Sequence, residues 1–425
     1  MKPLKIAMLT TFYPPHNFGG DGIGIQRLSR GLARLGCEVT VVHDTDAWRV
    51  LATGAEPEPV AEPVGIDVVR LKSRAPLVAT LLTQQLGRPV VNGGRIGELL
   101  DRGDFDVVNF HNISLIGGPG IWKYGRGLKL QMAHEHWLIC PMHVLWRNGR
   151  ERCDERRCLR CTLAHKRPPQ LWRWTDYLER EARHVDAFIA MSDFSRRKHA
   201  EFGFTREMEV LPYFLPDVDA ASHQLPAGGT RVHDRPFFLF VGRLERIKGL
   251  DEVIRAFRQI EGADLLVAGD GEYGPTLRAL AAGDPRIHFL GRVDPDRLSR
   301  YYREALALVV PSVCFETFGI ILIEAFRQGT PVVARRLGPF PEIVETASAG
   351  ELFENEQELL AALRRFIDDS AQRQRLGDRG REAFHRYWCE SVVVPRYLDI
   401  VARAAEKRGN TELAERVRAT GAKTQ

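Results

Sequence analysis

Short apolar runs alternate with amphipathic helical patterns along most of the 425 residues of this chain. The runs include KIAMLTTF (5–12), CEVTVVHD (37–44), DVVNFHN (106–112) and AFIAMS (187–192). Strands that are apolar on both faces and separated by helices form parallel sheets, because each crossover connection lays a helix on the sheet. The pattern therefore predicts an α/β fold of doubly wound parallel sheets.

The alternation occurs twice, on either side of a polar stretch rich in Pro and Gly at 217–235. It resumes with FFLFVGRL (237–244), DLLVAGDG (264–271) and LALVVPS (306–312). We therefore expect one Rossmann-like domain at residues 1–212, a linker at 213–235 and a second Rossmann-like domain at 236–388. Helical patterns fill residues 389–425, and we expect these helices to cross back to the first domain.

Composition narrows the function classes. The net charge of only +5 predicts no nucleic-acid partner, because such proteins carry a concentrated basic face. The start of the chain has no signal-peptide core, and no run approaches the ~20 apolar residues of a membrane helix. We expect a cytoplasmic protein, in which structural disulfides are rare.

A basic loop, GRLERIKG (242–249), follows the strand FFLFV of the second domain. Ligands of open parallel sheets bind at the carboxyl ends of strands. Arg243 and Lys248 lie there beside a predicted helix N-terminus, an arrangement that suits a diphosphate. The alternative interpretation is an exposed basic loop without a ligand.

A second motif, ETFGIILIE (316–324), follows the strand LALVVPS. A helix that begins near Gly319 places Glu316 in the entering loop and Glu324 on the second turn. The amides near Phe318, Gly319 and Ile320 are then free to meet a phosphate, and the two carboxylates are placed to bind sugar hydroxyls. The alternative is a buried Glu324 that the protein itself satisfies.

Together these motifs resemble glycosyltransferase family 4, the retaining GT-B enzymes. The segments that match the family's order and spacing are FVGRLERIKGLDEVIRAF, LVAGDGE, IHFLGRV, VVPSVCFETFGIILIEAFRQGTPVVA, PEIV and, in the first domain, TTFYPPHNFGGDG, DVVNFHN and AHEHW. The resemblance covers roughly residues 4–390. It implies two Rossmann-like domains facing across a cleft, and transfer of a hexose from a nucleotide sugar.

The resemblance also implies roles for individual residues. Arg243 and Lys248 would neutralise the leaving diphosphate. Glu324 would bind the ribose hydroxyls, and Glu316 hydroxyls of the transferred sugar. The remaining donor and acceptor contacts would come from the backbone of Phe318, Gly319 and Ile320, from Arg292 and Val293 near the base, from His134 facing the sugar, and from Gly19 and Gly20. One departure is Glu135, which stands where the family usually has Asp.

The transfer itself is expected to need no cofactor. Asp-x-Asp pairs that could hold a metal at the phosphates stand at Asp44 and Asp46, at Asp294 and Asp296, and in the linker, and none of them suits the diphosphate. The donor base (UDP, GDP or another), the sugar and the acceptor cannot be read from these motifs. Two alternatives remain: a NAD-dependent oxidoreductase, suggested by GDGEYG (269–274), and a nucleotide-sugar-binding or epimerising protein.

One short segment holds four of the seven cysteines, at Cys140, Cys153, Cys158 and Cys161. Four thiols in one loop of a reducing cell predict a structural zinc site, with an iron–sulfur cluster as the alternative. His143 and His165 could replace a thiolate, and unpaired thiols or a disulfide are the alternatives without a metal. We interpret the insert as the mark of a subgroup within the family. Trp146, Trp172 and Trp174 interleave with basic residues here, which leaves peripheral contact with an anionic membrane open.

Overall fold

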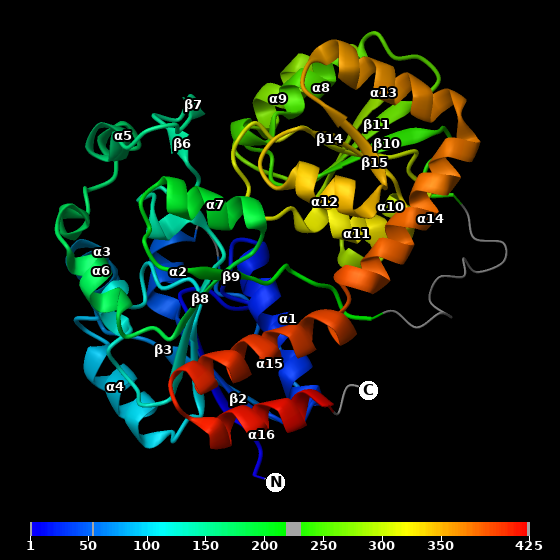
Figure 1. The fold of residues 1–425 in the computed structure, drawn as a ribbon. Helices are drawn as coiled ribbons and strands as arrows, with labels where there is room; N and C mark the ends of the chain where they lie inside the picture. Colours follow the sequence, from blue (N-terminus) through cyan, green and yellow to red (C-terminus); the bar gives the residue numbers. More distant parts are fainter. Residues whose placement is uncertain (1, 53–54, 218–230, 423–425) are drawn as a thin grey trace. The chain divides into compact units, whose positions relative to one another are not determined.

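The computed structural model describes residues 2–52, 55–217 and 231–422, and divides the chain into two compact units (Figure 1). Unit 1 comprises Met1–Tyr213 with Glu390–Gln425, and unit 2 comprises Phe214–Cys389. Most of the predicted linker, residues 218–230, lies outside the described residues.

Unit 1 is built on a seven-stranded parallel sheet in the order β3-β2-β1-β4-β5-β8-β9. Its central strands are buried on both faces, as their unbroken apolar runs predicted. The strands are β1 (Lys5–Thr10), β2 (Glu38–Asp44), β3 (Ile66–Leu71), β4 (Val107–Phe110), β5 (Leu128–Ala133), β8 (Ala187–Ala190) and β9 (Met208–Val210). A short antiparallel pair, β6 (Trp146–Arg147) and β7 (Glu151–Arg152), stands apart from this sheet.

Helices and 3-10 turns connect these strands. They are α1 (Gly20–Arg34), α2 (Thr45–Leu51), α3 (Pro76–Leu86), α4 (Gly93–Arg102), α5 (Cys158–Ala164), α6 (Tyr177–Ala182) and α7 (Asp193–Glu201), with 3-10 turns η1 (Pro119–Ile121), η2 (His136–Leu138) and η3 (Leu171–Trp174). None of the helices in the described parts of the chain combines the length and apolar character needed to cross a bilayer.

The last two helices, α15 (Glu390–Lys407) and α16 (Thr411–Gly421), belong to unit 1. In Figure 1 they form the orange-red pair beside α1. The Tyr397 hydroxyl lies 3.1 Å from the Asn109 side-chain nitrogen in β4. Arg416 of α16 pairs with Asp106 at 2.7 Å. These contacts fasten the end of the chain to β4 and to the residue just before it, 288 and 310 residues earlier in the sequence.

Unit 2 has a six-stranded parallel sheet in the order β12-β11-β10-β13-β14-β15. Its strands are β10 (Phe237–Val241), β11 (Asp264–Ala268), β12 (Ile287–Gly291), β13 (Leu308–Val310), β14 (Val332–Arg335) and β15 (Gly350–Phe353). Its helices are η5 (Arg246–Lys248), α8 (Leu250–Phe257), α9 (Gly274–Ala281), α10 (Pro295–Glu304), α11 (Ile320–Gln328), α12 (Phe340–Ala347), α13 (Glu356–Asp368) and α14 (Ser370–Tyr387). The predicted doubly wound α/β class is confirmed in both units.

Each sheet reverses its strand order at one point, between β1 and β4 in unit 1 and between β10 and β13 in unit 2. Loops leave the two strands in opposite directions there, so a crevice opens at the carboxyl edge of the sheet. The predicted site residues follow these strands: Gly19 and Gly20 come after β1, Arg243 and Lys248 after β10, and Glu316 after β13.

Candidate functional site

In unit 2, a cation and a carboxylate meet at the reversal point. Lys248 Nζ lies 2.6 Å from Glu316 Oε1, and the Ser312 hydroxyl lies 3.2 Å from the same oxygen. Burial works to lower the pKa of Lys248, but the Glu316 carboxylate beside it holds that pKa above its ordinary value. Burial works to raise the pKa of Glu316, and Lys248 holds it below its ordinary value. Both groups are therefore charged at neutral pH.

Arg243 lies where this loop leaves β10. Its side chain is 61% exposed, and its guanidinium lies 3.0 Å from the Glu245 carboxylate. Its charge also helps to lower the pKa of Glu316. Arg292 and Val293 leave β12, two strands away in the sheet, and Arg292 is exposed. The Gly269 amide links the β11 and β12 loops by donating to the Gly291 carbonyl at 2.7 Å.

Helix α11 begins where the sequence predicted. Gly319 is its N-cap with φ 128°, a left-handed value that favours glycine, and a Cβ there would lie 2.9 Å from Phe340. Phe318 is buried, and Ile320 opens the helix. Glu324 lies one turn along, and the Tyr302 hydroxyl donates to its carboxylate at 2.9 Å. The structure thus places Lys248, Glu316 and the start of α11 together, with Glu324 held by a tyrosine.

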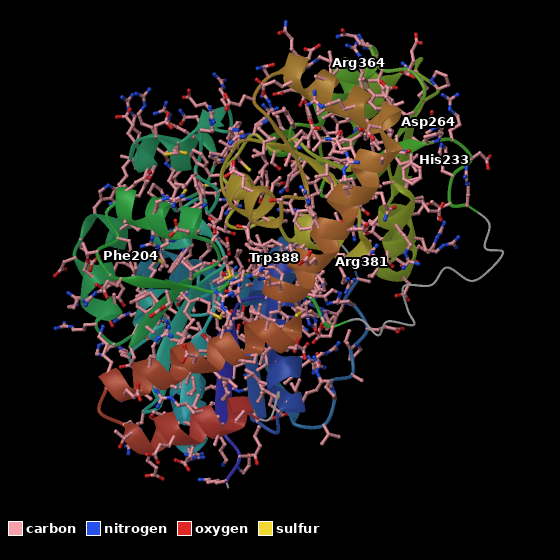
Figure 2. All side chains as sticks on the ribbon, turned by 45° about the vertical axis from the view of Figure 1, so that its right-hand side comes forward. Phe204, His233, Asp264, Arg364, Arg381 and Trp388 are labelled. Carbon is pink, nitrogen blue, oxygen red and sulfur yellow. The ribbon has the colours of Figure 1, made fainter. Side chains whose placement is uncertain are left out.

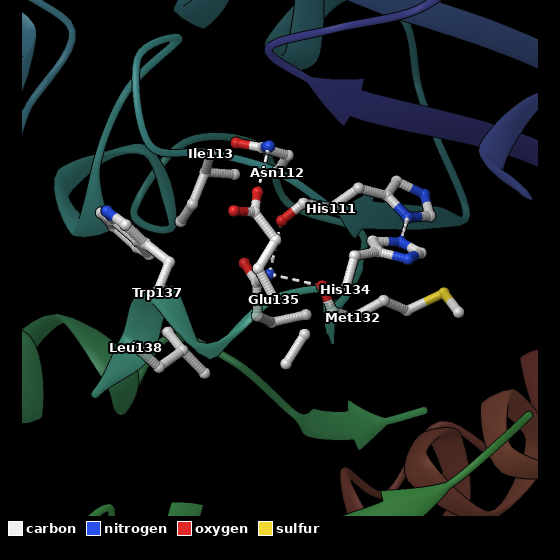
Figure 3. Close-up of a pocket in the computed structure, with 10 residues that line it drawn as sticks. His111, Asn112, Ile113, Met132, His134, Glu135, Trp137 and Leu138 are labelled. Carbon is white, nitrogen blue, oxygen red and sulfur yellow. Dashed lines mark hydrogen bonds between the residues drawn. The ribbon is translucent and has the colours of Figure 1, made fainter. Parts of the chain in front are cut away.

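In unit 1, His134 follows β5 and is buried (Figure 3). Its Nδ1 lies 2.6 Å from the Tyr213 hydroxyl, and its Nε2 lies 2.8 Å from Nδ1 of His111. Burial lowers the pKa of His134 to about 4, so the ring is neutral at physiological pH. Both ring nitrogens are engaged within unit 1, and the predicted contact of His134 with the sugar stays a prediction.

Next to His134, Glu135 joins a polar chain that the sequence did not single out. The Asn112 amide donates to Glu135 and, at 3.2 Å, to Asp21 (Figure 3 draws the Asn112–Glu135 bond). The His143 Nδ1 forms a hydrogen bond with the other Glu135 oxygen. Burial works to raise the pKa of Glu135, and His143 holds it below its ordinary value. Asn112 could have been recognised in the sequence as a site residue from its place just after β4. No local sequence pattern identifies Tyr213 as one.

Gly19 and Gly20 lie at the N-terminus of α1. A Cβ at Gly19 would approach only Asp21 Oδ1, at 3.3 Å, and one at Gly20 would meet no atom within 4 Å. The free protein therefore does not itself require glycine at position 20. Gly24 is different, because a Cβ there would lie 2.4 Å from the Tyr213 ring. Whether a ligand requires the glycines at positions 19 and 20 stays a prediction.

The four clustered cysteines line one cavity of about 20 Å³ in unit 1. Like the other three cysteines, they form no disulfide. Burial raises the pKa of the Cys153 thiol to about 11. Burial also raises the pKa of Cys140, against backbone hydrogen bonds from Leu145 and Met142 that lower it.

A different group meets a simple distance test for metal ligands. Within the described ranges, three candidate ligand atoms lie within 4.8 Å of one another only at His233, Asp264 and His288. Figure 2 shows His233 and Asp264 close together in unit 2. Arg235 Nε lies 3.0 Å from Asp264 Oδ1, so this carboxylate already has a cation. No three of the four clustered cysteine sulfurs lie within 4.8 Å of one another.

The Gly-rich stretch GDGEYG has a structural explanation. A Cβ at Gly269 would lie 1.9 Å from the Gly242 carbonyl oxygen, and one at Gly271 would lie 2.5 Å from that of Leu244. These glycines let the loops after β10 and β11 pack backbone against backbone. The close packing accounts for them without a dinucleotide.

The aspartates of two Asp-x-Asp pairs have roles within the fold that involve no metal. Asp44 accepts the Asp46 amide at 2.9 Å and caps α2. Asp46 accepts the Ser73 amide at 2.9 Å. Asp294 is the N-cap of α10, but its side chain forms no capping hydrogen bond.

Comparison with known sequences agrees with the motifs. The model for "Glycosyl transferases group 1" matches residues 224–383, and that for "Glycosyltransferase Family 4" matches residues 18–216. A D-inositol 3-phosphate glycosyltransferase of Xylanimonas cellulosilytica is 27% identical, over 95% of this chain and 98% of its own. An uncharacterized glycosyltransferase of Methanocaldococcus jannaschii is 39% identical. That match spans 26% of this chain and only 30% of the relative's length.

Solved structures show the same fold. Sucrose-phosphate synthase of Thermosynechococcus elongatus superposes with a TM-score of 0.70 at 20% identity, over 94% of this chain and 98% of its own. HepE of Anabaena, solved in complex with UDP, superposes with a TM-score of 0.64 at 15% identity, over 94% of this chain and 100% of its own. The predicted GT-B class, with two Rossmann-like domains, is confirmed.

Proposed function

Since the chain belongs to the group 1 glycosyltransferases of family 4, we propose that it transfers a hexose from a nucleoside diphosphate sugar to an acceptor hydroxyl. The observation that carries this proposal is the pair of Lys248 and Glu316, 2.6 Å apart beside the N-terminus of α11. A cation beside a helix N-terminus suits a diphosphate, and carboxylates suit sugar hydroxyls. HepE, a structural neighbour, was solved with UDP, which supports a nucleotide as the ligand.

The proposed chemistry retains the anomeric configuration. The bond from the anomeric carbon to the diphosphate oxygen breaks through an oxocarbenium-like state, and the acceptor oxygen bonds to the same face of that carbon. The acceptor proton passes to the departing phosphate oxygen. Arg243 and Lys248 stabilise the negative charge that gathers on this leaving group, where binding energy lowers the barrier. Glu324 binds the ribose, and Glu316 orients the sugar.

We propose that these cations and amides hold the diphosphate without a metal ion. The Asp44 and Asp46 side chains, one candidate metal pair, accept backbone N–H groups within unit 1. Asp294 and Asp296 lie at the start of α10, and no third carboxylate joins them in a metal-binding group among the described residues. Turnover should therefore need no added Mg²⁺ or Mn²⁺.

A panel of nucleotide sugars tests the donor assignment. The thermal unfolding of the full chain is measured in the presence of each compound, and the release of free nucleotide is followed in a separate assay. A donor present at about 100 times its dissociation constant should stabilise the protein by about 2.7 kcal/mol. A response to NAD(H) and to no nucleotide sugar would instead favour the oxidoreductase alternative. If a nucleotide sugar binds and is epimerised but its sugar is never transferred, the alternative of a nucleotide-sugar-binding or epimerising protein is favoured.

Variants test the roles of the cations. Arg243→Ala and Lys248→Ala should each lower turnover by ~10² or more, because each removes a contact made to the leaving group in the transition state. Arg364→Ala is a matched control: this exposed arginine of unit 2 lies on α13, and its guanidinium donates to the Gln259 carbonyl at 3.4 Å. Near-normal turnover in either test variant refutes the diphosphate assignment.

For the acceptor side we propose a cytoplasmic enzyme that contacts an anionic membrane through unit 1. Helix α3 and η3 pack together, joined by a hydrogen bond of 3.1 Å from Trp172 to the Gln84 carbonyl. Next to this contact, Leu171 and Trp174 are 68% and 54% exposed. Exposed basic residues such as Lys166 lie nearby in the chain. Apolar anchors among cations suit anionic headgroups, which would present a lipid-linked acceptor.

Vesicle binding tests this contact. The protein should bind phosphatidylglycerol vesicles at low salt and lose binding at high salt, with little binding to phosphatidylcholine. Replacing both Leu171 and Trp174 by Ser should weaken binding, whereas Leu51→Ser, at an exposed position on α2, should not. Equal binding by both variants argues against this surface.

A further inference from the structure

The Cys140–Cys161 segment brings its thiols together from three local structures. Cys140 follows η2, Cys153 follows the β6–β7 pair, and Cys158 and Cys161 lie one turn apart on α5. All four line one cavity, together with Met142 and Trp146. Its volume of about 20 Å³ holds roughly one water-sized sphere. That space is enough for a single ion among the four thiols.

Backbone N–H groups point at the sulfur atoms. The Asn148 amide donates to Cys161 Sγ at 3.3 Å. Leu145 and Met142 direct their amides at the Cys140 sulfur. The turns that allow this contain left-handed residues: Leu145 has φ 48° and Asn148 has φ 55°. Such donors stabilise a negatively charged sulfur, as second-shell hydrogen bonds do around metal-bound thiolates.

A partly buried cation beside the thiols has no carboxylate partner. The Arg173 guanidinium lies 4.9 Å from the Trp137 ring and 4.5 Å from the Trp172 ring. It donates to the Trp137 carbonyl at 2.8 Å and to the Gln170 side chain. No acidic side chain of the described residues forms an ion pair with it. The Arg173 guanidinium lies close enough to the Cys140 and Cys158 sulfurs to interact with them electrostatically, so it would stabilise negative charge gathered at this cluster.

We propose that Cys140, Cys153, Cys158 and Cys161 bind one zinc ion as a closed tetrathiolate site. Four thiolates around Zn²⁺ carry a net charge of −2, which Arg173 partly balances. Binding displaces the four thiol protons to solvent. Zinc–sulfur bonds of about 2.3 Å place the sulfurs about 3.8 Å apart, so the metal draws the thiols inward from their present spacing.

The metal site would hold the segment that carries His143, whose ring pairs with Glu135. Glu135 in turn contacts Asn112 and, through it, Asp21 near the start of α1. Loss of zinc should therefore loosen this polar chain. An effect of zinc on turnover rests on the proposed glycosyl transfer, whereas the metal site itself does not.

Metal content tests the site independently of activity. The full chain, purified without chelator, should contain one zinc per chain by elemental mass spectrometry. After exchange with Co²⁺ it should show sulfur-to-cobalt charge-transfer bands and the visible bands of tetrahedral cobalt. Cys158→Ser and Cys161→Ser should each lower zinc affinity by about tenfold or more. Cys37→Ala, at a buried thiol of unit 1 outside the segment, should keep the zinc.

The unmodified protein decides the matter even if the variants fail to fold. Wild-type protein without zinc, with all seven thiols titratable after unfolding, overturns the proposal. Iron with inorganic sulfide overturns it in favour of a cluster, and a disulfide within the segment overturns it as well. A zinc-loaded protein that releases no nucleotide from any sugar donor leaves the zinc site standing and refutes the proposed function instead.

Discussion

Replacing Lys248 by Met isolates the charge of the candidate diphosphate site. The change keeps most of the side-chain volume but leaves Glu316 without its ion pair, with the Ser312 hydroxyl 3.2 Å away and the Cys314 thiol 4.0 Å away. Breaking a buried pair costs about 3–5 kcal/mol, and breaking an exposed one about 0–1. The two side chains are 22% and 25% exposed, so we expect unit 2 to lose about 2 kcal/mol near pH 8.

The pH dependence of this loss has a definite sign. In the wild type, Lys248 holds the pKa of Glu316 below its ordinary value, so the pair stabilises the fold above pH 4.5 and loses that effect as the pH falls through the lower, folded pKa. In Lys248→Met, burial is the largest remaining influence on Glu316 and raises its pKa, against smaller lowering effects of the Ser312 hydrogen bond and the Arg243 charge. The carboxyl then takes up a proton on mild acidification, so the penalty should shrink between about pH 7 and pH 4.

Hydrogen exchange of peptides from α11 measures this effect in unit 2 alone. A loss of 2 kcal/mol corresponds to roughly 30-fold faster exchange, after correction for intrinsic rates. The double variant Lys248→Met/Glu316→Gln should recover part of the loss, because no unpaired charge remains. As a control, Arg255→Met breaks an exposed pair with Asp251 and should cost under ~0.5 kcal/mol. A Lys248→Met penalty that is equal at pH 8 and pH 4.5 would refute the reasoning.

Two further predictions concern unit 1. Burial raises the pKa of Asp44 from 3.8 to about 7, so the folded state keeps a proton that the unfolded state loses. The free energy of unfolding should fall by roughly 4 kcal/mol between about pH 4 and pH 7 through this group, and Asp44→Asn should flatten that slope in urea titrations; an unchanged slope contradicts it. Gly24→Ala places a Cβ 2.4 Å from the Tyr213 ring, which contacts His134. It should lower stability by about 1–3 kcal/mol in thermal unfolding, whereas Gly20→Ala, with no atom within 4 Å, should cost much less; equal losses in the two variants exclude this clash.

The α/β class could be predicted because its signals are local. Apolar runs without alternation require strands buried on both faces, and the helical patterns between them require crossovers. The same local order placed Arg243 and Lys248 after β10, and set Glu316 in the loop and Glu324 in the helix around Gly319. The spacing of the four cysteines is likewise a local signal, and it depends on no other part of the chain.

The partners of these residues could not be predicted in this way. Lys248 and Glu316 are 68 residues apart, and they meet because β10 and β13 are neighbours in the sheet although two strands separate them in sequence. Tyr213 reaches His134 across 79 residues. Arg173 reaches the ring and the carbonyl of Trp137 across 36 residues. The sequence determined which side chains stand at strand ends, since periodicity is local. The tertiary structure decided which of them meet and at what pKa, since burial and pairing depend on strand order.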